Sequence, residues 1–113
     1  MTEIWHNPRC SKSRQTLAIL EAHGEDITVR RYLDDAPDVA TLRAVLAALG
    51  VDPINIMRKG ENLFKELGLG ADTDDATLIA AMASHPILIE RPIVIKNGKA
   101  RMGRPPESVT EIL

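Results

Sequence analysis

The sequence predicts an α/β protein in which helices pack on a small mixed sheet. Three observations support this fold class: a strand-helix-strand pattern over residues 3–32, a helical middle over residues 38–83, and a hairpin signal at Asn97-Gly98. The chain has 113 residues, of which 44% are hydrophobic and 27% are charged, which is typical of one globular domain. We therefore expect a single domain over residues 1–113.

The first third of the chain reads as strand, loop, helix and strand. Glu3–His6 is short and partly apolar, and from Ser11 the apolar residues recur at helical spacing until Gly24, a residue suited to follow a helix. Residues from Ile27 to Tyr32 alternate in polarity, as a second strand does, and the Asp-Asp-Ala-Pro run that follows ends it. Two strands joined by one helix are expected to be parallel, with a right-handed crossover.

The middle of the chain carries helical patterns and no clear strand. The segments have apolar residues on one face and end at glycine or before proline, which are helix stop signals. We expect a helical insertion at about residues 38–84, with a short helical turn between two of its helices. The expected helices are Asp38–Leu49, Glu61–Leu67 and Asp74–Ala83, and the turn is Pro53–Met57.

The last third predicts an antiparallel hairpin and a closing helix. Pro92–Lys96 and Lys99–Met102 flank Asn97-Gly98, the strongest short-range signal for a hairpin turn. Apolar residues then recur on one side of Ser108–Leu113, as in a helix that docks on a core. The resulting order, β-α-β, helical insertion, β-β-α, with a four-stranded mixed sheet, is that of a thioredoxin-like fold.

Composition excludes several classes of function. The net charge of -2 gives no basic surplus of the kind that nucleic-acid binding needs. No apolar run approaches the roughly 20 residues that span a bilayer, and the acidic start is unlike a signal peptide, so we expect no membrane association and a cytoplasmic location. One cysteine and three scattered histidines allow neither an internal disulfide nor a recognisable metal site.

The single cysteine, Cys10, is a candidate nucleophile. It lies between an Asn7-Pro8 turn and a predicted helix, with Arg9, Lys12 and Arg14 nearby. Backbone N–H groups at a helix start and basic neighbours both favour the thiolate, which is the reactive form. The alternative is an inert cysteine in the core, but its charged and hydroxyl-bearing neighbours do not suit a core.

Three arginines at segment ends are candidate oxyanion ligands. Arg58, Arg91 and Arg104 each precede a turn or a proline and none belongs to a helical face. The planar guanidinium binds oxyanions through two N–H groups, so three converging arginines would hold a tetrahedral oxyanion beside the sulfur. Each arginine alone is better explained as a solvated surface residue, and only a fold that brings the three together supports the oxyanion site. The Arg91-Pro92 bond, at the start of a predicted strand, is expected to be cis.

Several separated motifs carry a resemblance to a known family. These are His6–Arg14, Arg58-Lys59, His85–Val94 and Gly103–Glu107. In them the chain resembles the glutaredoxin-dependent arsenate reductase (ArsC-like) family, almost end to end, and in particular its shorter chromosomal type. The resemblance implies a thioredoxin-like fold and an oxidoreductase that reduces arsenate to arsenite. It also implies glutathione as co-substrate, glutaredoxin as partner and no bound cofactor.

The resemblance also implies roles for the candidate residues. Cys10 would attack arsenate to form a thioarsenate adduct, which glutathione attacks and glutaredoxin finally clears. Arg58, Arg91 and Arg104 would hold the oxyanion.

Residues near the thiol receive supporting roles from the same resemblance. His6 matches the histidine that supports a low thiol pKa, although it is nearly as consistent with a residue that only fills the end of the first strand. Ser13 and Arg14 match the loop around the cysteine. His23 and His85 match no catalytic position and are expected to be surface or packing residues.

The residues themselves indicate that a second thiol comes from another molecule. A dithiol oxidoreductase has its resolving cysteine three positions after the first, where this chain has Ser13. Releasing an oxidised sulfur requires another thiol, which must then be external. Two alternatives stay open: an Spx-like interaction protein that regulates transcription, whose redox Cys-x-x-Cys pair is missing here, and a glutaredoxin-like deglutathionylase.

Overall fold

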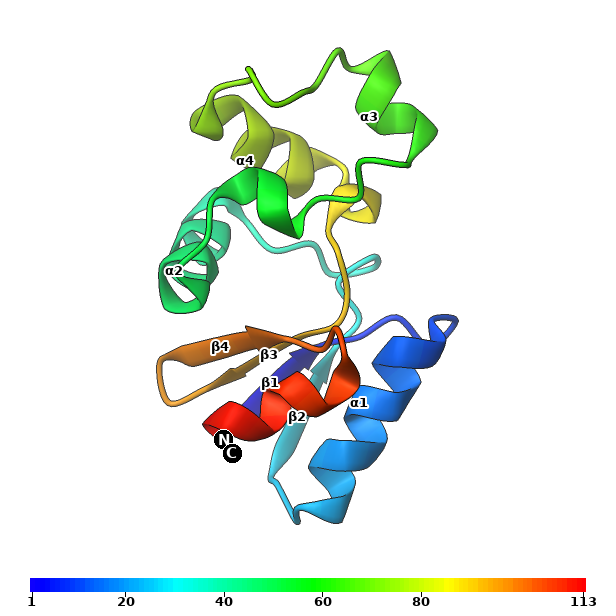
Figure 1. Ribbon diagram of the computed structural model, residues 1–113, viewed down its shortest axis with the longest axis vertical. Helices are drawn as coiled ribbons and strands as arrows, with labels where there is room; N and C mark the ends of the chain where they lie inside the picture. The colour runs from blue at the N-terminus through cyan, green and yellow to red at the C-terminus, as the bar shows by residue number, and fades with distance from the viewer. The chain divides into compact units, whose positions relative to one another are not determined.

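The computed structural model describes residues 1–113 and divides the chain into two compact units (Figure 1). The first, the sheet unit, consists of Met1–Asp35 and Arg91–Leu113. The second, the helical unit, consists of Ala36–Glu90. The sheet unit is thus built from both ends of the chain, and it contains every strand.

The sheet unit contains the predicted four-stranded mixed sheet. Its strands are β1 (Thr2–Trp5), β2 (Ile27–Arg30), β3 (Ile93–Lys96) and β4 (Lys99–Met102), in the order β2-β1-β3-β4. β1 pairs with β2 in parallel and with β3 in antiparallel orientation, and β3 pairs with β4 in antiparallel orientation. The α/β fold class and the parallel pairing of the first two strands are confirmed.

The turn between β3 and β4 is the hairpin that the sequence predicts. Asn97 and Gly98 both have positive φ angles, 50° and 77°, which is the requirement of a two-residue turn of the primed type. The flanking residues Lys96 and Lys99 face each other across the ladder.

Two helices cover the same face of the sheet. The helix α1 (Ser11–Ala22) contributes Leu20, and the 3₁₀ helix η3 (Pro106–Ile112) contributes Val109 and Ile112. These side chains pack with Ile4 of β1 and Val94 of β3 into one buried core. The ribbons of α1 and η3 lie on the same side of the sheet (Figure 1). The core fixes α1, and with it the residue that precedes α1, against the sheet.

The closing helix and two strand ends differ from the sequence prediction. A helix is expected over Ser108–Leu113, but the structure has a 3₁₀ helix that begins at Pro106. Its buried residues, Pro106, Val109 and Ile112, recur every third position, which matches the three residues per turn of a 3₁₀ helix. β2 ends at Arg30 because the chain turns next, with the N–H groups of residues 34 and 35 donating to the Arg31 carbonyl.

At the other strand end, β1 covers Thr2–Trp5, so His6 lies just after it.

The helical unit contains the three expected helices in shorter or shifted form. They are α2 (Val39–Leu49), α3 (Asn62–Glu66) and α4 (Asp75–Ser84), with the 3₁₀ turns η1 (Pro53–Ile56) and η2 (Pro86–Leu88). Asp38 caps α2 by accepting a hydrogen bond from the Thr41 N–H at 2.8 Å, and Asp74 caps α4 in the same way from Thr77 at 3.0 Å. The turn η2 is not anticipated from the sequence.

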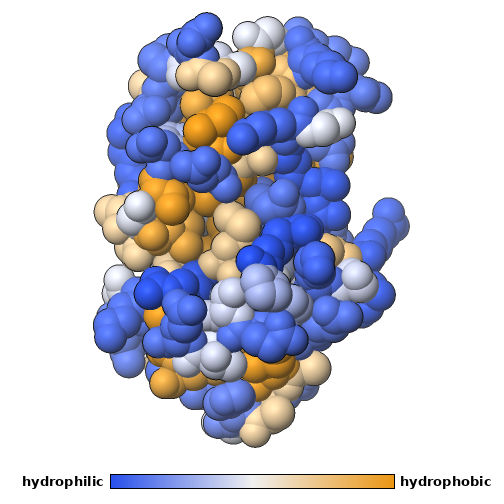
Figure 2. Space-filling model, in the orientation of Figure 1, coloured by the Kyte–Doolittle hydropathy of each residue, from blue (hydrophilic) through white to orange (hydrophobic).

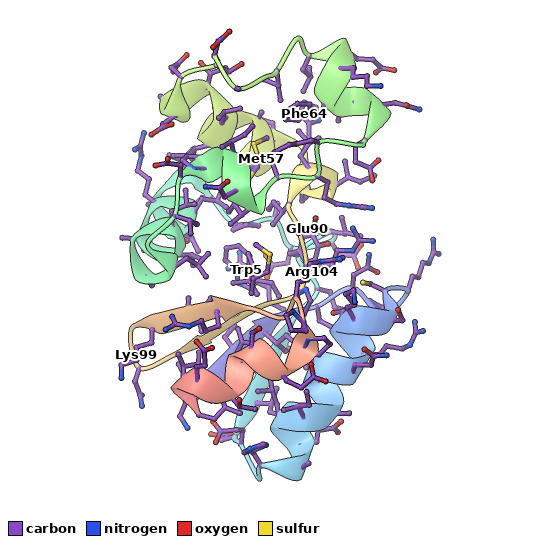
Figure 3. The ribbon with its side chains drawn as sticks, viewed as in Figure 1. Trp5, Met57, Phe64, Glu90, Lys99 and Arg104 are labelled. Carbon is purple, nitrogen blue, oxygen red and sulfur yellow. The ribbon has the colours of Figure 1, made fainter.

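The helical unit buries apolar side chains of its own. α2 and α4 pack against each other, and Met57 pairs with Ile89 in an isolated antiparallel bridge. Met57 and Phe64 lie inside this unit (Figure 3). Its other buried apolar residues include Leu42, Val45, Leu46, Ile56, Leu78, Ile79, Met82 and Leu88.

The surface mixes polar and apolar side chains. Figure 2 shows hydrophilic side chains surrounding smaller apolar areas on the visible face. The large apolar side chains that stay exposed come from both units: Met1, Val29, Leu33, Val39, Val51, Leu67 and Ile87. Every helix of the structure is too short or too polar to cross a bilayer.

Candidate active site

Cys10 occupies the N-cap position of α1. It has extended backbone angles, φ -94° and ψ 123°, and its side chain is buried. At this position the first N–H groups of the helix lack intrahelical acceptors and give the helix end a partial positive charge. The fold therefore puts the thiol where an anion is favoured.

A tight turn leads from β1 to the cysteine. The Asn7 carbonyl accepts a hydrogen bond from the Cys10 N–H at 3.0 Å, with Pro8 in the second position of the turn. The Asn7 side-chain oxygen accepts from the Arg9 N–H at 3.0 Å. Nη1 of Arg14 donates to the Pro8 carbonyl at 2.9 Å, so the helix also holds the turn. The loop-supporting role that the family resemblance implies for Arg14 stays a prediction.

Ser13 and His6 form a buried pair behind the turn. The Ser13 hydroxyl lies 2.6 Å from Nδ1 of His6 and accepts a hydrogen bond from the Asn7 N–H at 3.0 Å. Burial, and then the charges of Arg31 and Arg14, lower the pKa of His6 below its ordinary value. His6 is therefore a neutral imidazole at neutral pH.

The thiol pKa is set by opposing effects. Burial raises the pKa of Cys10, but the backbone N–H of Ser13, the charge and hydrogen bond of Arg91, and the N–H of Lys12 lower it. The lowering effects prevail, and the pKa lies below the ordinary value of a thiol. The sulfur makes no conventional capping hydrogen bond, so the N–H groups act mainly through their dipoles. His6 is not among these influences, and its direct partner is Ser13.

Two of the three candidate arginines lie together in the sheet unit. Arg91 directly precedes β3, and its guanidinium is among the groups that lower the pKa of the Cys10 thiol. Arg104, labelled in Figure 3, follows β4. Its Nε donates to the Arg91 carbonyl at 2.9 Å. The Arg91-Pro92 bond is cis, as expected, and Arg104-Pro105 is a second cis bond.

Gly103 is a site-building residue that the sequence reasoning missed. Its N–H donates to the Pro92 carbonyl at 2.9 Å. A Cβ atom at this position would lie 2.5 Å from Oγ1 of Thr16 and 2.7 Å from Cγ of Pro92, so a side chain cannot be accommodated without movement. The sequence indicates Gly103 only as the first residue of the Gly103–Glu107 motif. The steric reason for a glycine there depends on contacts with Thr16 and Pro92, which lie in distant segments.

The third candidate arginine, Arg58, belongs to the helical unit. Its N–H donates to the Leu88 carbonyl at 2.8 Å, and Nη1 forms an ion pair with Oε1 of Glu61 at 2.7 Å. Both side chains of this pair are largely shielded, with 30% and 25% of their areas exposed. Arg58 therefore has a carboxylate partner within its own unit.

The segment that carries the thiol is basic on its outside. Arg9 and Lys12 are exposed, and the sequence has no acidic residue between Glu3 and Glu21. Such a surface attracts anions even though the whole chain has a net charge of -2. The histidine, cysteine and acidic side chains form no group of three or more that could hold a metal ion.

The comparisons with known proteins identify the family of the chain. Residues 5–112 match the model of a family described as the ArsC family. The uncharacterized protein YfgD of Escherichia coli (strain K12) is 50% identical over 113 residues, which cover 98% of this chain and 95% of YfgD. An arsenate reductase of Neisseria meningitidis serogroup A is 46% identical, with 98% of this chain and 97% of the relative covered. The solved structure of an arsenate reductase from Vibrio cholerae has a TM-score of 0.94 and 52% identity, covering 99% of this chain and 97% of that one.

Proposed function

This chain belongs to the ArsC family, and we propose that it is an arsenate reductase whose nucleophile is Cys10. The observation that carries the proposal is the buried Cys10 thiol at the start of α1, whose pKa lies below the ordinary value, with the Arg91 guanidinium among the groups that lower it. A thiolate attacks far better than a thiol, and a guanidinium beside it binds tetrahedral oxyanions well.

In the first step, the Cys10 thiolate attacks the arsenic atom of arsenate. An As–S bond forms, an As–O bond breaks, and the departing oxygen leaves as water after protonation. Negative charge stays on the arsenate oxygens, and the Arg91 guanidinium stabilises it. The product is a thioarsenate adduct on Cys10 in which arsenic is still pentavalent.

Reduction to arsenite needs two electrons, which two thiols supply by becoming a disulfide. Cys10 is the one cysteine of the chain, so this chemistry requires sulfur from outside. We assign that role to glutathione, with glutaredoxin removing the glutathione sulfur. The exposed cations Arg9 and Lys12 favour an anionic thiol such as glutathione. A reducing, cytoplasmic compartment suits both reductants.

The remaining candidates receive supporting roles in the proposal. Arg91 holds the oxyanion beside the sulfur, with Arg58 and Arg104 as the further ligands that the family resemblance implies. His6 acts through Ser13, whose hydroxyl it contacts at 2.6 Å and whose N–H faces the thiol. Arg14 holds the turn through the Pro8 carbonyl.

A coupled assay tests the proposed activity. Arsenate, glutathione, glutaredoxin and glutathione reductase are combined with the protein, and NADPH oxidation is followed. We expect turnover that is abolished in Cys10→Ser, that stops when either glutathione or glutaredoxin is omitted, and that phosphate inhibits competitively. Turnover that survives in Cys10→Ser would contradict the role of the thiol.

The same assay separates the two other functions that the sequence left open. A deglutathionylase would remove glutathione from a glutathionylated protein through Cys10 without turning over arsenate. An interaction protein of the Spx-like kind would turn over neither substrate and would be retained by RNA polymerase in a pull-down. Either pattern would replace the proposed function.

A further inference from the structure

Two consecutive residues after β4 hold two consecutive residues before β3. Nε of Arg104 donates to the Arg91 carbonyl at 2.9 Å, and the Gly103 N–H donates to the Pro92 carbonyl at 2.9 Å. The close approach of Gly103 to Thr16 and Pro92 seats this segment against α1, the helix that carries the thiol. The end of one strand is thereby fixed to the beginning of its neighbour at the site.

The hydrogen bond to Arg91 restricts how Arg104 can bind an anion. An arginine binds an oxyanion most firmly through two parallel N–H groups, and one of its two such pairs includes Nε. Nε carries a single proton, and in Arg104 that proton is donated to a carbonyl of the protein. The pair of N–H groups that includes Nε therefore cannot bind an oxyanion while Nε donates to the Arg91 carbonyl.

Arg91 is the arginine whose charge lowers the pKa of the Cys10 thiol. It lies just before β3, outside the regular ladder that begins at Ile93, so its main chain depends on other contacts for its position. A long side chain keeps a defined contact only when its own backbone is fixed, because each free torsion costs conformational entropy. Arg104 supplies one of the hydrogen bonds that fix the main chain of Arg91.

We propose that Arg104 is a positioning residue, which holds the main chain of Arg91 and so keeps the Arg91 guanidinium against the Cys10 sulfur. The inference deepens the proposed function, and it depends on that function only for the identity of the nucleophile. Loss of the Arg104 hydrogen bond should let Arg91 leave the sulfur. The thiolate then loses its partner, and a larger share of Cys10 stays protonated at a given pH.

The test is the pH dependence of Cys10 alkylation by iodoacetamide, measured without arsenate or added thiol. Four proteins are compared: wild type, Arg91→Gln, Arg104→Gln and the double variant. In Arg104→Gln we expect the rate at a fixed pH below the midpoint to fall roughly two- to tenfold, the range for one hydrogen bond. The midpoint should move to higher pH, by no more than it moves in Arg91→Gln.

The double variant separates positioning from a direct charge effect. If Arg104 works through Arg91, the double variant should have the profile of Arg91→Gln alone. Additive shifts would overturn the proposal, because Arg104 would then act on the thiol by its own charge. An unchanged profile in Arg104→Gln would also overturn it.

Arg101→Gln is the matched control, because it removes a positive charge from β4 that pairs with Glu111 at 2.9 Å. Its profile should match wild type, and circular dichroism confirms that each variant is folded. Arg104→Met, which keeps the aliphatic part of the side chain, takes the place of Arg104→Gln if that variant loses its fold. Since the assay contains no arsenate, absence of arsenate turnover would refute the proposed function and leave this test intact.

Discussion

The sheet unit and the helical unit use the same type of residue in opposite ways. In the sheet unit, the Arg91 guanidinium helps to lower the pKa of the Cys10 thiol, and Arg104 donates a hydrogen bond to the main chain of Arg91. In the helical unit, Arg58 is held by the carboxylate of Glu61 at 2.7 Å. The sequence makes these arginines look alike, since each stands at the end of a segment. The difference teaches that the partner of an arginine, and not its place in the chain, determines what it does at a site.

The largest effects are expected from the cores of the two units. Leu20 of α1 and Leu42 of α2 are both 0% exposed, and truncating either to alanine should lower the free energy of unfolding by about 2–5 kcal/mol. Trp5, the one tryptophan, reports on the sheet unit by fluorescence, whereas circular dichroism reports on helices of both units. If the units unfold together, both probes give one midpoint in each variant. A Leu42→Ala transition that circular dichroism detects before Trp5 responds would show that the units unfold separately.

The next largest effect is expected on kcat/KM for arsenate, when Arg91 and Arg58 are each replaced by lysine. Arg91→Lys keeps the charge but loses the planar fork, and we expect kcat/KM for arsenate to fall on the order of 100-fold. Arg58→Lys should lower kcat/KM for arsenate by a smaller factor, because the wild-type guanidinium already forms an ion pair with Glu61. The coupled NADPH assay measures both variants. Wild-type turnover in Arg91→Lys would contradict the proposed role of Arg91 as an oxyanion ligand.

Removing the carboxylate partner of Arg58 should have a smaller effect in the opposite direction. In Glu61→Gln the guanidinium no longer shares its charge with an anion, so KM for arsenate should fall about two- to fivefold with kcat unchanged, as expected for a partly exposed pair. Glu66→Gln, on the same short helix and exposed, is the control. A KM that stays at the wild-type value in Glu61→Gln would indicate that the pair does not compete with substrate.

The smallest effect concerns the buried imidazole of the sheet unit. The folded-state pKa of His6 is lowered, whereas in the unfolded chain it is about 6.5. As pH falls below about 6.5, the unfolded chain takes up the proton first, so the free energy of unfolding decreases until the pH reaches the folded-state pKa. Urea unfolding followed by Trp5 fluorescence at a series of pH values should show this loss in wild type and a weaker loss in His6→Gln. Equal losses in both proteins would exclude His6 as the source.

Local patterns were enough to predict most of the framework. Asn97-Gly98 indicated the hairpin, Asn7-Pro8 indicated the turn before the thiol, and the basic neighbours of Cys10 indicated a helix start that favours an anion. Each of these signals lies within a few residues of the feature that it predicts. Short-range patterns therefore predicted the turn and the helix start that flank Cys10, whose role as nucleophile stays a proposal.

Contacts between distant segments could not be predicted in the same way. Arg104 and Arg91 are 13 residues apart, and their hydrogen bond depends on how β3 and β4 end. The collision that restricts position 103 to glycine involves Thr16 and Pro92, which belong to two other segments. The buried residues of 106–112 recur every third position, which indicates a 3₁₀ helix. The predicted α-helix over Ser108–Leu113 does not take this spacing into account.

The N-cap position of Cys10 has a consequence for the helix itself. Serine is among the best residues for starting a helix, because its oxygen accepts a hydrogen bond from the helix, and cysteine is not. The Cys10 side chain makes no such bond, so α1 begins with a weaker end than its backbone allows. At a pH low enough to keep Cys10 protonated, Cys10→Ser should therefore melt at a higher temperature than the wild type, and it should be inert towards arsenate. Sulfur at this position gives reactivity, whereas oxygen would give a more stable helix. The unreactive serine variant is therefore the better protein for trapping complexes with substrate.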